Sequence, residues 1–279
     1  ACEVTENTVG ISLHDALKRI TKSTKAIMPV HYASNPEGIK DVYKFAKKNK
    51  LRVIEDAAHA FGCSYNGKKI GSFGDIVCFS FDGIKNITSG EGGCVVTSDK
   101  KVAQYIRDTR LLGVKKDTEN RFSGKRSWDF DVVHQGYRYH MSNLFAAIGR
   151  AQLKKLDSIF SPKRKRIAKI YRKELNDTKD LLFFETNLNE YTPHIQPIRI
   201  INGKRDLVRR VLNKNNIETG IHYKPNHLLS IYYDNKKNKL PLTEKLYSQI
   251  LTLPLHPELK NKDKIKISNL IKKTLSNKK

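Results

Sequence analysis

The sequence predicts an α/β protein, and two observations support that prediction. Short, nearly continuous apolar runs alternate with amphipathic helical patterns through the first half of the chain. Asp56 and Lys85 both lie just beyond the ends of such strands. Continuous apolar strands separated by helices indicate a sheet that is buried on both faces. Ligands of such sheets collect at the carboxyl ends of the strands, so both side chains are expected at one crevice.

Four strands and two helices are expected in the first half. Apolar patterns predict strands at 25–32, 51–58, 75–81 and 92–99. The stretch NPEG opens a helix that reaches Lys48, and a second helix runs over 100–112. The polar stretch 115–131 is expected to be a long loop. Doubly wound sheets commonly have five or more strands, so four strands suggest a chain that begins inside a domain.

The second half predicts a smaller α+β unit. Ser142 is a candidate cap for a helix over 142–160. Helical patterns follow at 161–176, 203–215 and 261–276, and strand patterns at 194–201 and 219–223. The sequence therefore predicts two domains, 1–155 and 156–279.

The chain is strongly basic, with a formal net charge of +25 over 279 residues. Its lysines are scattered over predicted helices, and the densest stretch, 161–173, is typical of the exposed face of an amphipathic helix. No nucleic-acid reader motif accompanies the charge, so we expect no nucleic-acid partner. The field could instead steer an anionic substrate such as a nucleotide sugar.

Membrane and metal partners are not expected either. No apolar run approaches the ~20 residues of a membrane span, and the first ten residues lack the regions of a signal peptide. We therefore expect a cytoplasmic protein. The cysteines show no CxxC spacing, which disfavours a zinc site or a disulfide framework. They are Cys2, Cys63, Cys78 and Cys94.

The carboxylate of Asp56 and the amine of Lys85 suit the cofactor pyridoxal phosphate (PLP). PLP needs a lysine amine for covalent attachment and an anionic carboxylate beside its pyridinium nitrogen. Ser80 is well placed to give the phosphate a hydroxyl donor. An acid and a lysine at this spacing are a weak signal in isolation, since Asp56 could be a helix cap and Lys85 a surface residue.

The surroundings of these residues strengthen the signal. The segments EDAAHAFG, NGKKIGSFGDIVCFSF and KNITSGEGGCVVTSD resemble the DegT/StrS family of PLP-dependent nucleotide-sugar aminotransferases. The resemblance continues through GYRYHMSNLFAAIGRAQLKKLD and TGIHYKPNHLL to LTLPLHPEL, which is essentially the whole chain. It implies the aspartate-aminotransferase-like type I fold. Residues 1–155 would be a PLP-binding large domain with an incomplete sheet, and 156–279 a small C-terminal α+β domain.

The resemblance also implies roles for single residues. Lys85 matches the lysine that holds the cofactor covalently and then shuttles a proton during amino transfer. Asp56 matches the partner of the pyridinium nitrogen, and Ser80 matches a phosphate-binding serine. His59 matches a position that packs against the cofactor ring or its oxygen, although it could equally be a core histidine.

The chain departs from the family pattern at a few positions. Arg138 stands where many relatives place an asparagine that reaches the phosphate across a dimer interface, and His140 stands where they have arginine. Arginine can still bind phosphate bidentately, so Arg138 is carried over as a cofactor contact. Asp82 replaces an aromatic or histidine residue. His222 and Tyr223 match a segment that faces the substrate.

The function implied by the resemblance is amino transfer from glutamate to a keto-deoxy sugar on a nucleotide diphosphate, by a homodimer, for O-antigen, capsule or glycan synthesis. Related dehydratases carry histidine at the position of Lys85, so the lysine favours amino transfer. Family members have roughly a hundred residues before the segment TKAIMPVHY, and a stretch of that length is large enough to form a domain. The alternative is therefore a truncated, catalytically inactive paralogue or fragment that keeps only the fold and the dimer surface.

Overall fold

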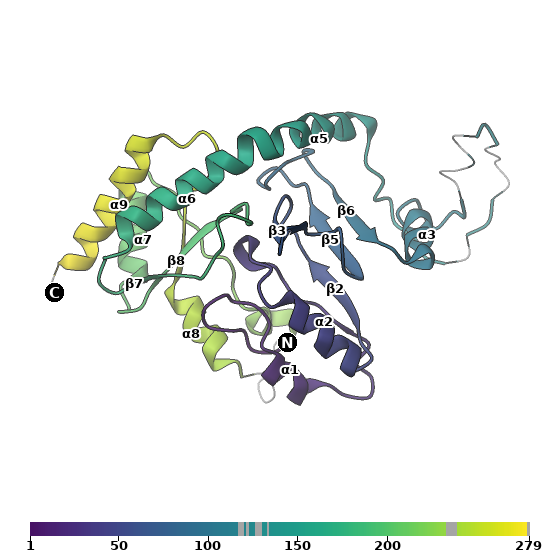
Figure 1. The fold of residues 1–279 in the computed structure, drawn as a ribbon, viewed down its shortest axis with the longest axis horizontal. Coiled ribbons are helices and arrows are strands. Elements are labelled where there is room, and N and C mark those ends of the chain that lie inside the picture. The colour runs from purple at the N-terminus through teal and green to yellow at the C-terminus, as the bar shows by residue number, and fades with distance from the viewer. Residues whose placement is uncertain (117–119, 121–122, 126–129, 133, 233–238, 278–279) are drawn as a thin grey trace.

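The computed structural model describes the whole chain except residues 117–119, 121–122, 126–129, 133, 233–238 and 278–279. Its larger sheet has the strand order β1-β2-β5-β6 (Figure 1). The strands are β1 (Ala26–Ile27), β2 (Arg52–Asp56), β5 (Ile76–Ser80) and β6 (Gly93–Thr97). β1, β2 and β5 are parallel, whereas β6 runs antiparallel to β5. The α/β prediction is confirmed.

Helix α2 (Ile39–Lys48) covers the start of this sheet. Its residues Ile39, Val42 and Ala46 are buried and form one cluster with Ile27 and Val53. The spacing of three and four residues places these side chains on one face of the helix. Parallel strands need such a crossover connection, because the chain has to return to the opposite end of the sheet. The helix predicted after NPEG is confirmed.

Strand β6 differs from the expectation of a sheet buried on both faces. The connection between β5 and β6 is the loop 81–92, which contains no helix, so the chain turns back and pairs antiparallel. Val95 and Val96 remain 40% and 38% exposed. Helix α3 (Lys100–Thr109), whose first amides are capped by the Asp99 carboxylate, packs next to β6. Most of the loop predicted at 115–131 lies outside the described residues.

A nearly continuous helical rod joins the two halves of the chain. It consists of α5 (Asn143–Lys155), a π-helical turn (Leu156–Phe160) and α6 (Ser161–Leu175). Figure 1 shows this rod passing from the larger sheet to the C-terminal elements. Pro162 is tolerated because it lies in the first turn of α6. The predicted domain boundary at 155–156 falls at the π turn, and the division into two domains stays a prediction.

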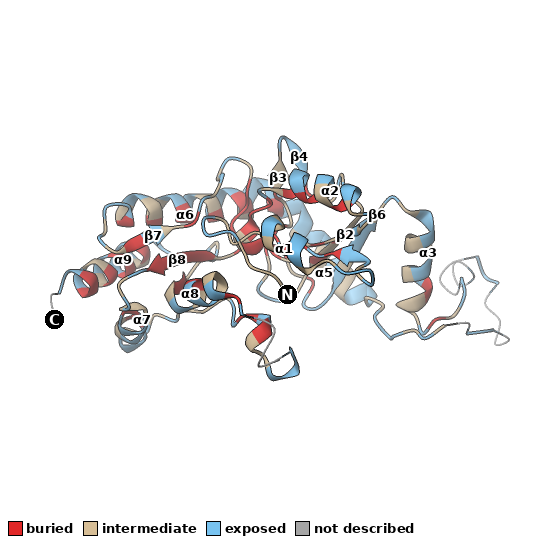
Figure 2. Ribbon diagram, turned by 90° about the horizontal axis from the view of Figure 1, so that it is seen from below, coloured by how far each residue is buried: buried red, intermediate tan, exposed pale blue. Residues whose placement is uncertain are grey.

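The smaller sheet is antiparallel, with the order β7-β8-β9. Its strands are β7 (Leu181–Phe183), β8 (Gln196–Ile200) and β9 (Ile250–Leu253). Apolar side chains of α6, α7 (Arg205–Lys214) and α9 (Asn261–Ser276) form one buried cluster with this sheet. Helix α8 (Pro241–Gln249) also contacts β8. Every residue of β8 is buried, as the red strand in Figure 2 shows.

Several sequence predictions were wrong or incomplete. Residues 219–223 form no strand, and their one bridge joins Gly220 to Thr252 of β9. The predicted strand at 25–32 shortens to the two residues of β1. Six helices and strands were missed, namely α1 (Leu13–Arg19), β3 (Ser64–Tyr65), β4 (Lys68–Lys69), β7, α8 and β9. Among the described residues, no helix has the length and apolar character of a membrane span.

Arg164 ties α6 to the loop before β8. The side chain is 5% exposed, and its Nη1 atom donates to the carbonyls of Pro193, His194 and Leu255 at 3.3, 3.1 and 3.3 Å. We expect Arg164→Met to lower the free energy of unfolding by about 2–4 kcal/mol, because buried carbonyls would lose their donor. Urea unfolding would measure this loss.

Lys163→Met is the matched control, since Lys163 is the neighbouring residue and makes an exposed ion pair with Glu258. Such a pair contributes about 0–1 kcal/mol. Equal losses in the two variants would contradict the role of Arg164.

Candidate functional site

The candidate site begins where two neighbouring parallel strands end. Asp56 is the last residue of β2 and pairs in register with Cys78 of β5. β5 ends two residues later at Ser80. The Asp56 carboxylate and the Ser80 hydroxyl therefore arise at one edge of the sheet, as predicted from the strand patterns. Both residues are partly buried, and Asp56 Oδ1 accepts a hydrogen bond from the Ala58 amide at 3.1 Å.

Lys85 lies in a loop, residues 81–92, that folds back on the end of β5. The Lys85 amide donates to the Asp82 carbonyl at 3.1 Å, and the Ser89 amide donates to the Phe81 carbonyl at 2.9 Å. The neighbouring Asn86 is buried, and its Nδ2 atom donates to the carbonyls of Phe61 and Thr192 at 3.0 and 3.1 Å. The backbone that carries Lys85 is thus held from three separate parts of the chain.

Three histidines lie close enough to Lys85 to be affected by its charge, and a tyrosine contacts one of them. The ring of His59 packs 4.4 Å from that of His194, and His59 Nε2 lies 3.1 Å from the hydroxyl of Tyr223. His222 Nδ1 lies 2.9 Å from Thr252 Oγ1, and the His222 carbonyl accepts from the Tyr32 hydroxyl at 2.8 Å. His59 and His194 are buried, whereas Tyr223 is 55% exposed.

Burial and the charge of Lys85 contribute to a lowered pKa in each of the three histidines. Burial, followed by the charges of Lys85 and His222, lowers the pKa of His59 to about 3. Burial, followed by the neighbouring basic groups His59, Lys85 and Arg164, lowers the pKa of His194 to about 2. The pKa of His222 is also lowered, by burial and then by Lys85. Desolvation disfavours the charged imidazolium, and a nearby ammonium adds to that effect. His59 and His194 are therefore neutral at physiological pH.

Tyr223 interacts both with His59 and with the carboxylates of the site. Its pKa is raised by burial and then by the carboxylates of Asp56 and Asp82. Asp82 follows the end of β5, and its amide lies 3.4 Å from Ser80 Oγ. The structure thus brings together Asp56, His59, Ser80, Lys85, His222 and Tyr223 around one region, although their chemical roles stay predictions.

Arg138 lies apart from this group. The residue is exposed and forms a bridge with Leu111, just after α3. Its neighbours Tyr137 and Tyr139 are exposed and stack on each other with ring centroids 5.0 Å apart. No contact joins Arg138 to Ser80 or Lys85 among the described residues.

The residues present fit PLP. Within the described part of the chain, no hydrogen bond or ion pair engages the Lys85 amine, and Nδ1 of buried His59 has no partner. One hydrogen bond is made by the Asp56 carboxylate there, which leaves it open to a cationic ring nitrogen. An amine, an acid, a hydroxyl and neutral aromatic rings at one edge of a sheet are the groups such a cofactor requires.

Sequence reasoning missed His194 and Ser34. Ser34 Oγ donates to the His59 carbonyl at 2.5 Å and accepts from the His194 amide at 2.8 Å, so it joins the two histidine segments. His194 was assigned to the start of a strand. The signal that could have singled it out is a lone histidine between two prolines at the edge of an apolar run.

Comparisons with known proteins agree on one family. A model of the DegT/DnrJ/EryC1/StrS aminotransferase family matches residues 1–272. Uncharacterized protein MJ1066 of Methanocaldococcus jannaschii is 38% identical over 283 aligned residues, which cover 98% of this chain and 73% of that protein.

Solved structures give the same result. Helicobacter pylori PseC, an aminotransferase involved in the biosynthesis of pseudoaminic acid, is 28% identical with a TM-score of 0.87. The match covers 98% of this chain and 72% of PseC. The PMP form of the putative sugar aminotransferase Spr1654 from Streptococcus pneumoniae is 25% identical with a TM-score of 0.88, covering 98% of this chain and 75% of Spr1654. The predicted fold is confirmed.

The lowered histidine pKa values predict a pH-dependent stability. In the unfolded chain these imidazoles gain a proton near pH 6.5, whereas in the folded protein they stay neutral down to about pH 3. The unfolded state therefore binds more protons below pH 6.5, so the free energy of unfolding should fall as the pH drops from 7 to 5.5. We expect His194→Phe to reduce this slope, measured by urea unfolding at several pH values.

His14→Phe is the control, because His14 is an exposed histidine of α1. Its slope should match that of the unmodified protein. An unchanged slope in His194→Phe would contradict the buried neutral state of His194.

Proposed function

The chain belongs to the DegT/DnrJ/EryC1/StrS aminotransferase family, and we propose that it transfers an amino group from glutamate to a keto-deoxy sugar carried on a nucleotide diphosphate. Its cofactor is PLP, and PMP is the amino form of that cofactor in which one relative was solved. The observation that carries the proposal is that Asp56, at the shared end of β2 and β5, acts on Tyr223, while Lys85 acts on His59, which contacts the Tyr223 hydroxyl. Among the described residues, the Lys85 amine makes no hydrogen bond or ion pair.

Each residue of the site has a proposed task. When bound, PLP supplies an electron sink for the carbon that exchanges the amino group. Lys85 holds the cofactor covalently and, once released, carries a proton to and from the reacting carbon. Asp56 keeps the pyridine nitrogen protonated, and Ser80 donates its hydroxyl to the phosphate. His59, held neutral by burial, packs against the ring without adding charge.

The substrate side of the site consists of His222 and Tyr223. Tyr223 is more than half exposed while its hydroxyl reaches His59, so it can touch both the cofactor region and an incoming sugar. We propose a keto sugar because the relative PseC acts in pseudoaminic acid biosynthesis. We infer that the product enters O-antigen, capsule or glycan synthesis in the cytoplasm.

A homodimer is part of the proposal, and helix α5 supports it. Within α5 no residue is buried, and Leu144 and Ile148 are 69% and 38% exposed one turn apart. α5 also runs close to the lysine loop, because a Cβ atom on Gly149 would lie 3.3 Å from Ser89 Cβ. A partner on α5 would therefore bury this apolar stripe next to the site, and could bring its own Arg138 toward the phosphate.

The alternative is an inactive chain that keeps the fold and the dimer surface. The chain covers 72–75% of the length of the proteins compared above. This partial coverage is the reason for considering the alternative. PLP binding and glutamate-dependent turnover distinguish the two. An active chain releases 2-oxoglutarate when supplied with glutamate and a nucleotide-linked keto sugar, whereas an inactive one does not.

We expect Lys85→Ala to abolish covalent attachment of PLP. Borohydride reduction followed by mass spectrometry should locate the cofactor on residue 85 of the unmodified chain and find none in the variant. Lys101→Ala, at an exposed lysine of α3, is the control and should label normally. Asp56→Asn should retain labelling but lower the rate of 2-oxoglutarate release on the order of 10²-fold, through loss of an electrostatic partner. Equal labelling of Lys85→Ala and the unmodified chain would refute the assignment.

Leu144→Glu should weaken the dimer by at least about tenfold in its dissociation constant, because a charge would be buried without a partner. Sedimentation velocity over a concentration series would measure the shift. Leu17→Glu, at a leucine of α1 that is 57% exposed, is the control and should leave association unchanged. A dimer unaffected by Leu144→Glu would exclude α5 as the interface.

A further inference from the structure

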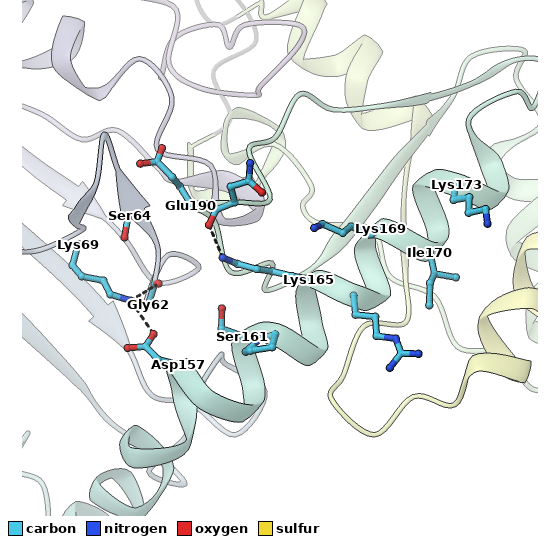
Figure 3. Close-up of a pocket in the computed structure, with 13 residues that line it drawn as sticks. Gly62, Ser64, Lys69, Asp157, Ser161, Lys165, Lys169, Ile170, Lys173 and Glu190 are labelled. Atoms are coloured by element: carbon cyan, nitrogen blue, oxygen red, sulfur yellow. Dashed lines mark hydrogen bonds and ion pairs between the residues drawn. The ribbon is translucent and has the colours of Figure 1, made fainter.

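A basic cavity of about 710 Å³ lies between α6, the β3–β4 hairpin and the loop 189–190 (Figure 3). Its volume falls within the range of small-molecule sites. None of the residues that line it belongs to the candidate site described above. The stretch 161–173 was expected to be a solvated helix face, yet part of that face lines this cavity.

One stripe of α6 supplies most of the positive charge. Lys165, Lys169 and Lys173 follow each other at intervals of four residues and therefore lie on one side of the helix. Figure 3 shows the amines of Lys165 and Lys169 directed toward the loop that carries Glu190, while Lys69 extends from β4 on the opposite side. With Arg166, five cationic side chains and two carboxylates line the cavity.

The two carboxylates leave the lining with an excess of positive charge, since five cations face them. Asp157 pairs with Lys69 at 2.8 Å. Glu190 accepts from the Gly67 amide and from Asn187 Nδ2, at 2.6 and 3.2 Å. Lys165 donates to the Asn189 carbonyl at 2.7 Å, and no carboxylate pairs with Lys169 in the described part of the chain.

Lys165 is affected both by burial and by its charged neighbours. Its pKa is lowered by burial above all, and the charges of Lys69 and Lys169 lower it further, whereas Cys63 and Asp157 act in the opposite direction. Lys165 is partly buried, whereas the other four cations are exposed, and one ion pair forms within the cluster. A bound anion would reduce the repulsion among these neighbouring like charges.

The floor of the cavity is rigid. Ser161 Oγ and Thr192 Oγ1 lie 2.6 Å apart, and Thr192 Oγ1 donates to the Gly62 carbonyl at 3.4 Å. Gly62 has a φ of +86°, and a Cβ atom there would meet Leu156 Cδ2 at 2.9 Å. These contacts join the start of α6 to the segment before β3, so the backbones that carry Lys165 and Lys69 are packed against each other.

The spacing of the lysines indicates the shape of the ligand. With a rise of about 1.5 Å per residue, successive lysines of the stripe stand about 6 Å apart and the three span about 12 Å. A single phosphate is too short to contact all of them. Lysine is also a strong phosphate ligand as a point charge. We propose that this cavity binds a small polyphosphate, a chain of two or more linked phosphates, either free or as part of a nucleotide.

The test compares two charge-matched double variants by calorimetric titration with inorganic tripolyphosphate. Lys165→Gln/Lys169→Gln alters the cavity, whereas Lys262→Gln/Lys266→Gln removes two exposed lysines at the same spacing from α9. The unmodified chain should bind one tripolyphosphate. The cavity variant should bind about 100-fold more weakly, because each ammonium group that is removed weakens binding about tenfold, while the α9 variant stays within twofold. Urea unfolding of both variants verifies that they remain folded.

Further titrations identify the source of the phosphates and test the competing explanations. Uridine diphosphate that binds more tightly than pyrophosphate would assign the site to a nucleotide, and equal affinity would assign it to free polyphosphate. Equal weakening of the two double variants would overturn the proposal, because the general field of a +25 chain would then account for binding. Binding of a DNA duplex, abolished in the cavity variant, without one-to-one tripolyphosphate binding would overturn it in favour of nucleic acid. The site does not depend on the proposed amino transfer, since its measurement uses neither PLP nor turnover.

Discussion

Two parallel strands that end at the same edge of a sheet are the constraint on which the candidate site depends. The register that pairs Asp56 with Cys78 places the Asp56 carboxylate and the Ser80 hydroxyl at neighbouring strand ends. A slip of one residue would turn Asp56 to the other face of the sheet. Lys85 has no strand to hold it, so its position rests on Asn86, whose amide donates to carbonyls of two distant segments. The geometry of the candidate site therefore relies on ordinary backbone pairing.

Much of the first sheet could be predicted, because its strands are short apolar runs that end in polar residues. The direction of β6 was not anticipated, since its sequence is as apolar as that of β5 while its pairing is decided by a connection that contains no helix. The misassigned strand at 219–223 has a similar cause. A glycine followed by apolar and aromatic residues favours extended backbone, but only Gly220 pairs with the edge strand β9, through one bridge to Thr252.

The candidate residues near the strand ends could be predicted from local motifs, whereas the residues that support them could not. Ser34 joins the His59 carbonyl to the His194 amide, across sequence separations of 25 and 160 residues. Nothing in a single sequence links such positions, because a serine that bridges two loops has the same local pattern as one that faces water. The unusual neutrality of His194 likewise arises from burial beside other basic groups, which are brought to it by folding.

Helix α6 combines two unrelated surfaces at different angles around one axis. Ile167, Tyr171 and Leu175 belong to the core of the smaller sheet, while Lys165, Lys169 and Lys173 line the basic cavity. Because the helical repeat places these rows on different sides of α6, substitutions of the lysines need not disturb the packing of the apolar row. Homologues could thus differ in which anion they bind at this surface, or bind none, while the packing of α6 on the smaller sheet stays the same.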